Sequence, residues 1–183
     1  MSRLFRWVFA GALVGSVALV VMLSLQVRDL RTRLAEAQRR MLFPRAGDVV
    51  PRFDAITLGG EAVRVGEGPP GSRQLLLVFN SACPICRETV PAWRRLDSLV
   101  AGVSGLSVLG WSQDPDSLSR AYVAEMGFAF PVVAPDLRWL RPYKVEGVPA
   151  TLVVGDSGRV LYARSGALTP AAVDSAVVVA QGG

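Results

Sequence analysis

The fold of this chain is decided by the stretch Leu75-Leu76-Leu77-Val78-Phe79-Asn80-Ser81-Ala82-Cys83-Pro84-Ile85-Cys86-Arg87. The apolar run 75–79 predicts a buried β-strand, because a strand that is covered on both faces lacks polar alternation. A short turn follows, and Pro84 suits the first position of a helix, where its missing N–H needs no partner. The stretch therefore predicts a strand that leads through a turn into a helix opening on a Cys-x-x-Cys motif.

Cys83 and Cys86 are the only cysteines in the chain. The partial positive charge at a helix start favours a thiolate, and the thiolate is the form that attacks disulfides. We predict that Cys83, just before the helix, attacks first and that the more buried Cys86 resolves the mixed disulfide. The alternative is a structural disulfide, but a bridge between such close neighbours closes a tiny loop and stabilises little. The Cys83–Cys86 pair is then the redox group, and no further cofactor is expected.

The composition excludes several kinds of site. The chain contains no histidine, which removes Ser-His-Asp and Cys-His catalysis and all His-bearing zinc or copper sites. Two cysteines alone make a poor metal site, so no metal is predicted.

The net charge of +5 is unevenly distributed. Residues 1–46 hold eight arginines and two acidic residues, a net charge of +6, whereas residues 47–183 carry a net charge of −1. The high isoelectric point therefore belongs to the N-terminal segment, and no nucleic-acid partner is predicted for the main domain.

The N-terminal segment contains eighteen residues without a charge, from Val8 to Leu25, with arginines on both sides. This length is near the minimum for a membrane-spanning helix. A cleaved signal peptide would have a shorter apolar core and a small-residue cleavage site, and no convincing Ala-x-Ala pattern follows the run. We expect an uncleaved signal anchor over 1–26 with a single transmembrane helix at 8–26, an amphipathic stalk or linker over 27–46, and one folded domain over 47–183.

Apolar residues continue through the stalk at spacings of 3, 4, 3 and 4, namely Val27, Leu30, Leu34, Ala37 and Met41. This pattern is typical of a coiled-coil seam. It would join two chains into a homodimer through 27–41, or it would let a single helix lie on its own domain or on lipid headgroups. Two heptads do not decide between these alternatives.

The remaining pattern predicts an α/β fold. The expected strands are a hairpin at 53–58 and 62–65, a central strand at 74–80, a strand at 105–112, and a hairpin at 149–154 and 159–165 with a turn at 155–158. The expected helices are 84–100 with an internal Pro91, 115–126, 136–143 and 170–180. This order predicts a mixed sheet with helices on both faces.

Four blocks in order make the segment 47–183 resemble the thioredoxin-like redoxins of the TlpA/ResA type, which are membrane-anchored thiol-disulfide oxidoreductases. The blocks are Gly47–Phe53, Cys83–Glu88 with Pro91, Ser112–Asp114 followed by Gly127–Val132, and Tyr143–Thr151. The resemblance implies a thioredoxin-like fold with Pro149 in the cis form. It also implies that the backbone of Val148 lies beside Cys83 and binds an extended substrate, together with Pro149, Pro84 and Ile85.

Some positions differ from the family pattern. Ala82 precedes Cys83 where many relatives carry Trp, and Asn80-Ser81-Ala82 resembles instead the redoxins that assist methylamine dehydrogenase maturation. Thr89 stands where some cytochrome-maturation members carry Glu, and Glu88 is expected to be a solvated helix residue. Leu77 stands where thioredoxin has a buried Asp, so these positions predict no buried carboxylate.

The resemblance further implies a single-pass protein of the cytoplasmic membrane with its redox domain in the periplasm. Such a protein would reduce disulfides of exported proteins during cytochrome c or metalloprotein maturation, with a membrane-embedded thiol donor as its second partner. Charge counting favours the opposite orientation, because six arginines follow the span within about twenty residues. The redox motif and the resemblance outweigh this count.

Two other functions fit the sequence less well. A peroxiredoxin-like peroxidase needs Pro-x-x-x-Thr-x-x-Cys, but this chain has Leu76, Asn80 and Cys83 at those positions. A non-enzymatic thioredoxin-fold module would bind a partner through the Val148 groove, and the intact cysteine pair counts against it.

Overall fold

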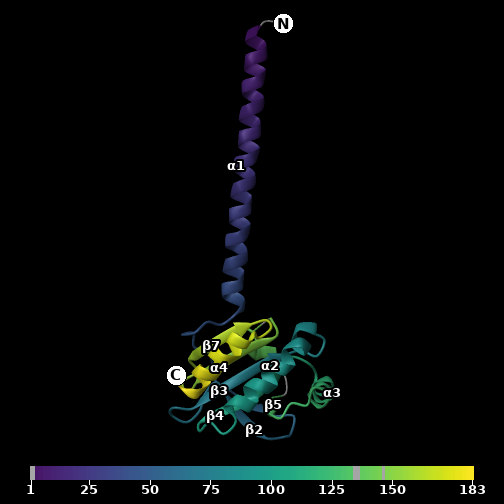
Figure 1. Cartoon of the computed structure of the whole chain (residues 1–183), viewed down its shortest axis with the longest axis vertical. Helices are drawn as coiled ribbons and strands as arrows, with labels where there is room; N and C mark the ends of the chain where they lie inside the picture. Colours follow the sequence, from purple (N-terminus) through teal and green to yellow (C-terminus); the bar gives the residue numbers. More distant parts are fainter. Residues whose placement is uncertain (1–2, 134–136, 146) are drawn as a thin grey trace. The chain divides into compact units, whose positions relative to one another are not determined.

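The computed structural model describes residues 3–133, 137–145 and 147–183, and it divides into two compact units, Met1–Met41 and Leu42–Gly183. The first unit is formed by one continuous helix, α1 (Arg3–Leu42), drawn in purple to blue in Figure 1. Its large apolar side chains between Leu13 and Leu34 are exposed wherever the structure describes them. Within the described residues, no helix combines the length and the apolar character needed to cross a membrane. The seam residues Ala37 and Met41 have side chains outside the described part.

The second unit contains a two-stranded hairpin, a five-stranded sheet and three α-helices (Figure 1). Its strands are β1 (Phe53–Ile56), β2 (Ala62–Val65), β3 (Arg73–Phe79), β4 (Leu106–Ser112), β5 (Val132–Val133), β6 (Ala150–Gly155) and β7 (Val160–Ser165). Its helices are α2 (Pro84–Val100), α3 (Asp116–Met126), the 3-10 turn η1 (Leu137–Trp139) and α4 (Pro170–Gln181).

The five-stranded sheet has the order β5-β4-β3-β6-β7. Strand β3 pairs in parallel with β4 and antiparallel with β6, with Leu76 opposite both Leu109 and Leu152. The short β5 is parallel to β4, and β7 is antiparallel to β6. The predicted mixed α/β sheet is therefore confirmed, and β3 is its central strand.

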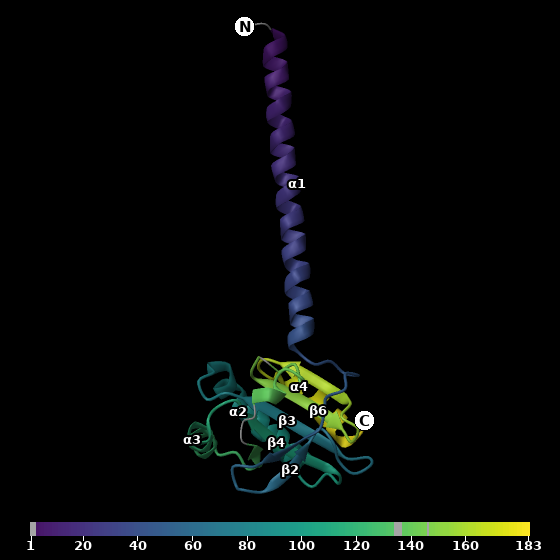
Figure 2. The ribbon, with the colours of Figure 1, turned by 180° about the vertical axis from the view of Figure 1, so that it is seen from behind.

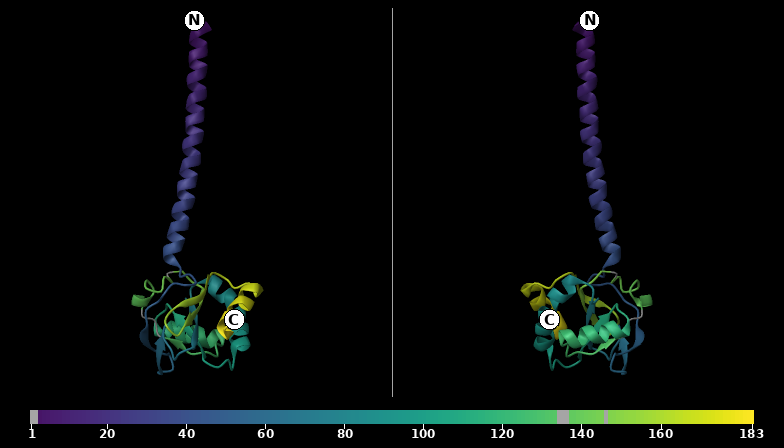
Figure 3. Two further views of the ribbon diagram at one scale, coloured as in Figure 1. Left: turned by 90° about the vertical axis from the view of Figure 1, so that its left-hand side faces the viewer. Right: turned by 90° about the vertical axis from the view of Figure 1, so that its right-hand side faces the viewer.

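Alternate residues of β3 face two separate cores, as the strand period requires. Leu75, Leu77 and Phe79 face a core that includes α2 and α4, whereas Leu76 and Val78 face a core that includes the β1–β2 hairpin and the 3-10 turn. Helices α2 and α4 lie side by side on the first face (Figure 1), and the view from behind shows the opposite face (Figure 2). In Figure 3 the yellow α4 and the dark blue hairpin lie on opposite sides of the sheet.

The expected helix at 136–143 is wrong. The structure has only the 3-10 turn Leu137–Trp139, followed by hydrogen-bonded turns through Lys144, and residue 136 lies outside the described part. Pro142 explains the difference, because proline has no N–H to donate and its ring disfavours helical backbone at the preceding residue. The second face of the sheet is therefore covered by a hairpin and turns rather than by the full α-helix that we predicted.

The turn between β6 and β7 forms at 155–158 as predicted, with the N–H of Gly158 donating to the carbonyl of Gly155 at 3.0 Å. Gly158 has a φ of 76°, and a Cβ at this position would lie 2.5 Å from the carbonyl oxygen of Val50. Only glycine fits here, because both the backbone conformation and the close approach exclude a side chain. The close approach at Gly158 thus packs the segment around Val50, which precedes β1, against the turn between β6 and β7.

One buried side-chain hydrogen bond ties α2 to the sheet. The indole Nε1–H of Trp93 donates to Oγ1 of Thr151 on β6 at 3.0 Å, and both residues are buried. We predict that Thr151→Val lowers the free energy of unfolding by about 1–3 kcal/mol, because it leaves a buried N–H without an acceptor. Urea denaturation measures the loss. Ser98→Ala is the control, because the Ser98 hydroxyl is exposed and bonds only within α2; equal effects of the two variants would contradict the prediction.

Candidate functional site

Three hydrogen bonds hold the turn between β3 and α2. The N–H of Cys83 donates to the carbonyl of Asn80 at 3.2 Å, and the N–H of Ala82 donates to the Asn80 side chain at 2.9 Å. The N–H of Ser81 donates to the carboxylate of Asp114 at 2.6 Å. Because β3 is buried from Gln74 to Phe79, this turn places Cys83 at a fixed point at the carboxyl end of the central strand.

Cys83 occupies the N-cap position of α2, and the residue is partly exposed. Two backbone groups approach this sulfur. The N–H of Cys86 donates to it at 3.4 Å, and the Cys83 thiol lies 3.7 Å from the carbonyl oxygen of Val148, to which it donates. An N–H at a helix start is a donor that stabilises a thiolate. The sulfur is therefore both accessible and placed where negative charge is favoured.

Cys86 lies one turn into α2 and is 0% exposed, in the core that also contains Phe79 and Trp93. The pKa of the Cys86 thiol is raised to about 12, chiefly by burial, with a lowering by the Asn80 backbone and smaller raising effects of a hydrogen bond and charge at Cys83. Both cysteines are free. The pair thus combines an accessible sulfur with a buried sulfur that stays protonated at neutral pH.

The peptide bond between Val148 and Pro149 is cis, as the resemblance implied. The carbonyl of Pro149 accepts the N–H of Gly166 at 2.9 Å, which fixes this segment to the end of β7. Val148 is half-buried and Pro149 is buried. The structure therefore brings the predicted segment beside Cys83, across 65 residues of sequence.

Pro84 and Ile85, between the two cysteines, are both exposed, Ile85 to 46%. The structure thus brings four of the six predicted site residues to one surface, namely Cys83, Pro84, Ile85 and Val148. The other two, Pro149 and Cys86, are buried.

Asp114 is the buried carboxylate that sequence reasoning missed. It is 5% exposed, follows the end of β4, and accepts hydrogen bonds from Ser81 and from the Ser112 hydroxyl at 3.4 Å. Its charge raises the pKa of the Cys86 thiol. The signal that could have found it is the polar run 112–114 at the end of an apolar strand. The carboxyl ends of parallel strands such as β3 and β4 meet at one edge of the sheet, so this run lies near the turn that carries Cys83.

Two positions that differ from the family pattern lie near the dithiol on α2, and the exposure of Glu88 agrees with the sequence prediction. Thr89 is buried and donates its hydroxyl to the carbonyl of Ile85 at 2.7 Å, so it carries no titratable proton to the site. Glu88 is exposed. Among the described residues, no group of three or more His, Cys, Asp or Glu side chains could hold a metal ion.

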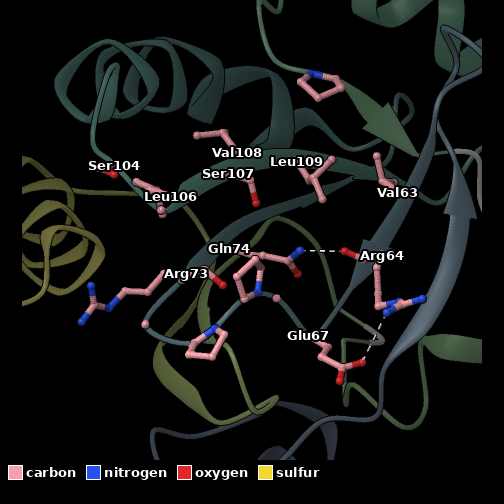
Figure 4. A pocket seen from close by; sticks show the side chains of 17 residues that line it. Val63, Arg64, Glu67, Arg73, Gln74, Ser104, Leu106, Ser107, Val108 and Leu109 are labelled. Atoms are coloured by element: carbon pink, nitrogen blue, oxygen red, sulfur yellow. Dashed lines mark hydrogen bonds and ion pairs between the residues drawn. The ribbon is translucent and has the colours of Figure 1, made fainter.

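A large hollow lies elsewhere, at the opposite end of β3 and β4 from Cys83 (Figure 4). Its volume is about 940 Å³, and its lining includes Arg64, Glu67, Arg73, Gln74 and Ser107. The Gln74 side chain accepts a hydrogen bond from the N–H of Gly66 and donates one to the carbonyl of Arg64. This hollow contains neither cysteine, and exchange with a protein disulfide requires an accessible sulfur rather than a cavity.

After the central strand, the chain places an accessible cysteine at the start of α2 and a buried cysteine one turn further on. A cis-proline segment lies beside the accessible cysteine. This arrangement defines a thioredoxin-like thiol-disulfide oxidoreductase. The profile of the Redoxin family matches residues 45–179. The chain therefore belongs to the Redoxin family, and the resemblance expected from the four sequence blocks is confirmed.

Individual relatives agree with this assignment. The chain is 26% identical over 163 residues to the methylamine utilization protein MauD of Methylophilus methylotrophus, covering 87% of this chain and 74% of MauD. It is 24% identical over 133 residues to the thiol-disulfide oxidoreductase ResA of Halalkalibacterium halodurans, covering 71% of this chain and 74% of ResA.

Solved structures share the fold. A DsbE-type thiol:disulfide interchange protein from Chlorobium tepidum superposes with a TM-score of 0.64 at 25% identity, covering 75% of this chain and 98% of that protein. StoA of Bacillus subtilis superposes with a TM-score of 0.59 at 15% identity, covering 71% of this chain and 96% of StoA.

We predict that Asp114→Asn lowers the pKa of the Cys86 thiol. The substitution removes a negative charge that disfavours the thiolate, while the amide oxygen still accepts the Ser81 N–H. Thiolate absorbance against pH, measured in a Cys83→Ser background, should show more thiolate at each alkaline pH. Asp116→Asn is the control, because this carboxylate on α3 is exposed; an unchanged or higher midpoint for Asp114→Asn contradicts the prediction.

Proposed function

We propose that Cys83 is the attacking thiol of this oxidoreductase and that Cys86 resolves the mixed disulfide. The observation that carries the proposal is the contrast between the two sulfurs: Cys83 is partly exposed at the helix start, and Cys86 is fully buried. The Cys83 thiolate attacks a substrate disulfide and releases one substrate thiolate. The Cys86 thiolate then attacks the Cys83 sulfur, releases the second substrate thiolate, and leaves a Cys83–Cys86 disulfide.

The surface around Cys83 suits an extended segment of a protein substrate. The Val148 backbone lies beside the sulfur, and the apolar side chains of Pro84 and Ile85 are exposed next to it. Backbone groups at such a site pair with any extended chain, so they recognise shape rather than sequence. Pro149 is buried, and we assign it the placing of Val148 rather than direct contact.

We further propose that residues 8–26 cross the cytoplasmic membrane and that the redox domain lies on its outer side. Support comes from the uncharged run of the sequence and from the exposure of apolar residues on consecutive positions of α1, among them Leu19, Val20 and Val21. A helix that is apolar all round is stable only in an apolar surrounding. In an exported position the dithiol would act as a reductant, supplied with electrons by a membrane-embedded thiol donor, because the space outside the cytoplasm is oxidising.

The substrates that fit this placement are exported proteins whose cysteines must be reduced before a cofactor is attached, such as an apocytochrome c or a metalloprotein precursor. The name of the relative ResA, a thiol-disulfide oxidoreductase, supports thiol-disulfide exchange as the reaction. The exposed residues Val27, Leu30 and Leu34 of α1 support pairing of two chains through 27–41.

The two alternative functions have less support. At the positions where a peroxidase carries Pro and Thr, Leu76 is a buried core residue and the Asn80 side chain is engaged by the N–H of Ala82. A binding module without turnover would keep its phenotype after Cys83→Ser, whereas the proposed oxidoreductase would lose it.

Trapping tests the roles of the two sulfurs. We predict that Cys86→Ser accumulates mixed disulfides between Cys83 and protein substrates, which mass spectrometry of the membrane fraction would identify. Cys83→Ser is the matched control and should trap none. In the single-cysteine variants Cys83 should be alkylated at least about tenfold faster than Cys86, because only the thiolate reacts; faster alkylation of Cys86 would reverse the assignment.

A reporter enzyme fused after Gly183 tests the placement. A reporter that is active only outside the cytoplasm should be active on the full chain and inactive on a chain lacking residues 1–26. The arginines at 28–45 would then lie against anionic headgroups, which attract them from either side of the membrane. Activity of a reporter that works only in the cytoplasm, fused to the full chain, would contradict the placement of the redox domain outside the cytoplasm.

A further inference from the structure

Gln113 follows the last residue of β4 and is half-buried. Its main-chain N–H donates to the carbonyl of Phe79 at 2.9 Å. Phe79 is the last residue of β3 and lies opposite Ser112, so this bond extends the pairing of β3 and β4 by one residue beyond the strand ends. Gln113 is thereby fixed beside the start of the turn that leads to Cys83.

The side chain of Gln113 reaches a different part of the chain. Its amide Nε2 donates to the carbonyl of Val145 at 3.0 Å, across 32 residues of sequence. Val145 is 0% exposed, and its own N–H donates to the carbonyl of Leu140 at 3.0 Å. Among the described residues, the Gln113 amide is the one donor to the Val145 carbonyl. This bond therefore fixes the point from which the chain enters the cis-proline segment.

The cis-proline segment carries the backbone that lies beside the reactive sulfur. The carbonyl oxygen of Val148 is 3.7 Å from the Cys83 sulfur, and the far end of the segment is fixed to β7 through the Pro149 carbonyl. Gly147 is exposed, and a Cβ at this position would have no described atom within 4 Å. Because packing does not hold the segment at Gly147, the anchor at Val145 contributes to the placing of Val148.

The next residue in the chain holds the other side of the site. The carboxylate of Asp114 accepts the N–H of Ser81 at 2.6 Å, within the turn that carries Cys83. Two consecutive residues after β4 therefore hold the two sides: Asp114 holds the turn, and Gln113 holds the cis-proline segment. The spacing between the Cys83 sulfur and the Val148 backbone is thus set from one point at the end of β4.

We propose that Gln113 is a positioning residue for peptide substrates, because its amide holds the cis-proline segment where the Val148 backbone can pair with an extended chain whose disulfide lies at Cys83. This inference rests on the proposed function and names a residue that sets the affinity of the site for a peptide. Gln113 acts through Val145 and not on the reacting sulfurs. It therefore assists a disulfide within an extended peptide, whereas a small disulfide without a peptide backbone gains nothing from it.

A coloured leaving group separates binding from exchange. The reduced full chain, in detergent, is mixed with an excess of a short peptide whose single cysteine is disulfide-bonded to nitrothiobenzoate. The Cys83 thiolate attacks the peptide sulfur, the sulfur–sulfur bond breaks, and nitrothiobenzoate leaves with the electron pair as a yellow thiolate. The dependence of this rate on peptide concentration gives a half-saturating concentration and a limiting rate.

Gln113→Met keeps the length of the side chain and removes the donor. It should raise the half-saturating concentration by about tenfold, roughly the net effect of one hydrogen bond, and leave the limiting rate unchanged. Dithiobisnitrobenzoate has no peptide backbone, so its reaction should show no comparable loss. Gln113→Asn keeps the amide but shortens it by one methylene, so it should repeat the result and serves as the second variant if Gln113→Met fails to fold.

The same peptide with N-methyl groups on the amides beside its cysteine tests whether the effect passes through the peptide backbone. This peptide should bind the unmodified protein more weakly, and Gln113→Met should not weaken it further, because the pairing with Val148 is already lost. Gln74→Met is the matched control. It removes a similar amide donor, which bonds the carbonyl of Arg64 at 2.6 Å at the opposite end of β3, and should change none of these values.

A half-saturating concentration that is the same in Gln113→Met, Gln113→Asn and the unmodified protein would overturn the inference while leaving the proposed function standing. An equal loss with dithiobisnitrobenzoate would overturn it in favour of a general role in folding. Equal binding of the two peptides to the unmodified protein would instead contradict the backbone pairing at Val148, on which the proposed substrate site itself depends.

Discussion

Strand β3 is hydrogen-bonded to a neighbour on each edge and covered by a core on each face, and every feature of the site depends on this enclosure. A strand held in this way cannot slip by one residue, because a slip would exchange the two sets of side chains between the cores. Its carboxyl end is therefore a fixed reference point. The turn that follows, and with it Cys83, is placed relative to β4 and β6 on either side.

The same enclosure gives the two cysteines different surroundings although only two residues separate them. The helical repeat turns Cys86 towards the core below α2, while Cys83 stays at the surface at the helix start. One sulfur can reach a substrate and the other cannot. Reactivity is thus divided between them by solvation and by the helix terminus, without any histidine in the chain.

Because the chain lacks histidine, the charge balance of the buried sulfur is set by groups from neighbouring elements. Asp114 follows the end of β4, is buried, and disfavours the Cys86 thiolate. Asp114 belongs to the segment between β4 and β5. This segment therefore belongs to the chemistry of the site as well as to the fold.

The sequence by itself determined the local features of this protein: the central strand, the helix opening on Cys83, the two hairpins and the family resemblance that implied a cis Pro149. These follow from periodicity, turn residues and motif order, which are properties of neighbouring residues. Pattern reasoning failed at 136–143, where Pro142 outweighed the helical pattern. Only the tertiary structure decided that Asp114 lies at the dithiol. Its contact with Ser81 joins residues 33 positions apart, and such a contact depends on strand order, which no local pattern encodes.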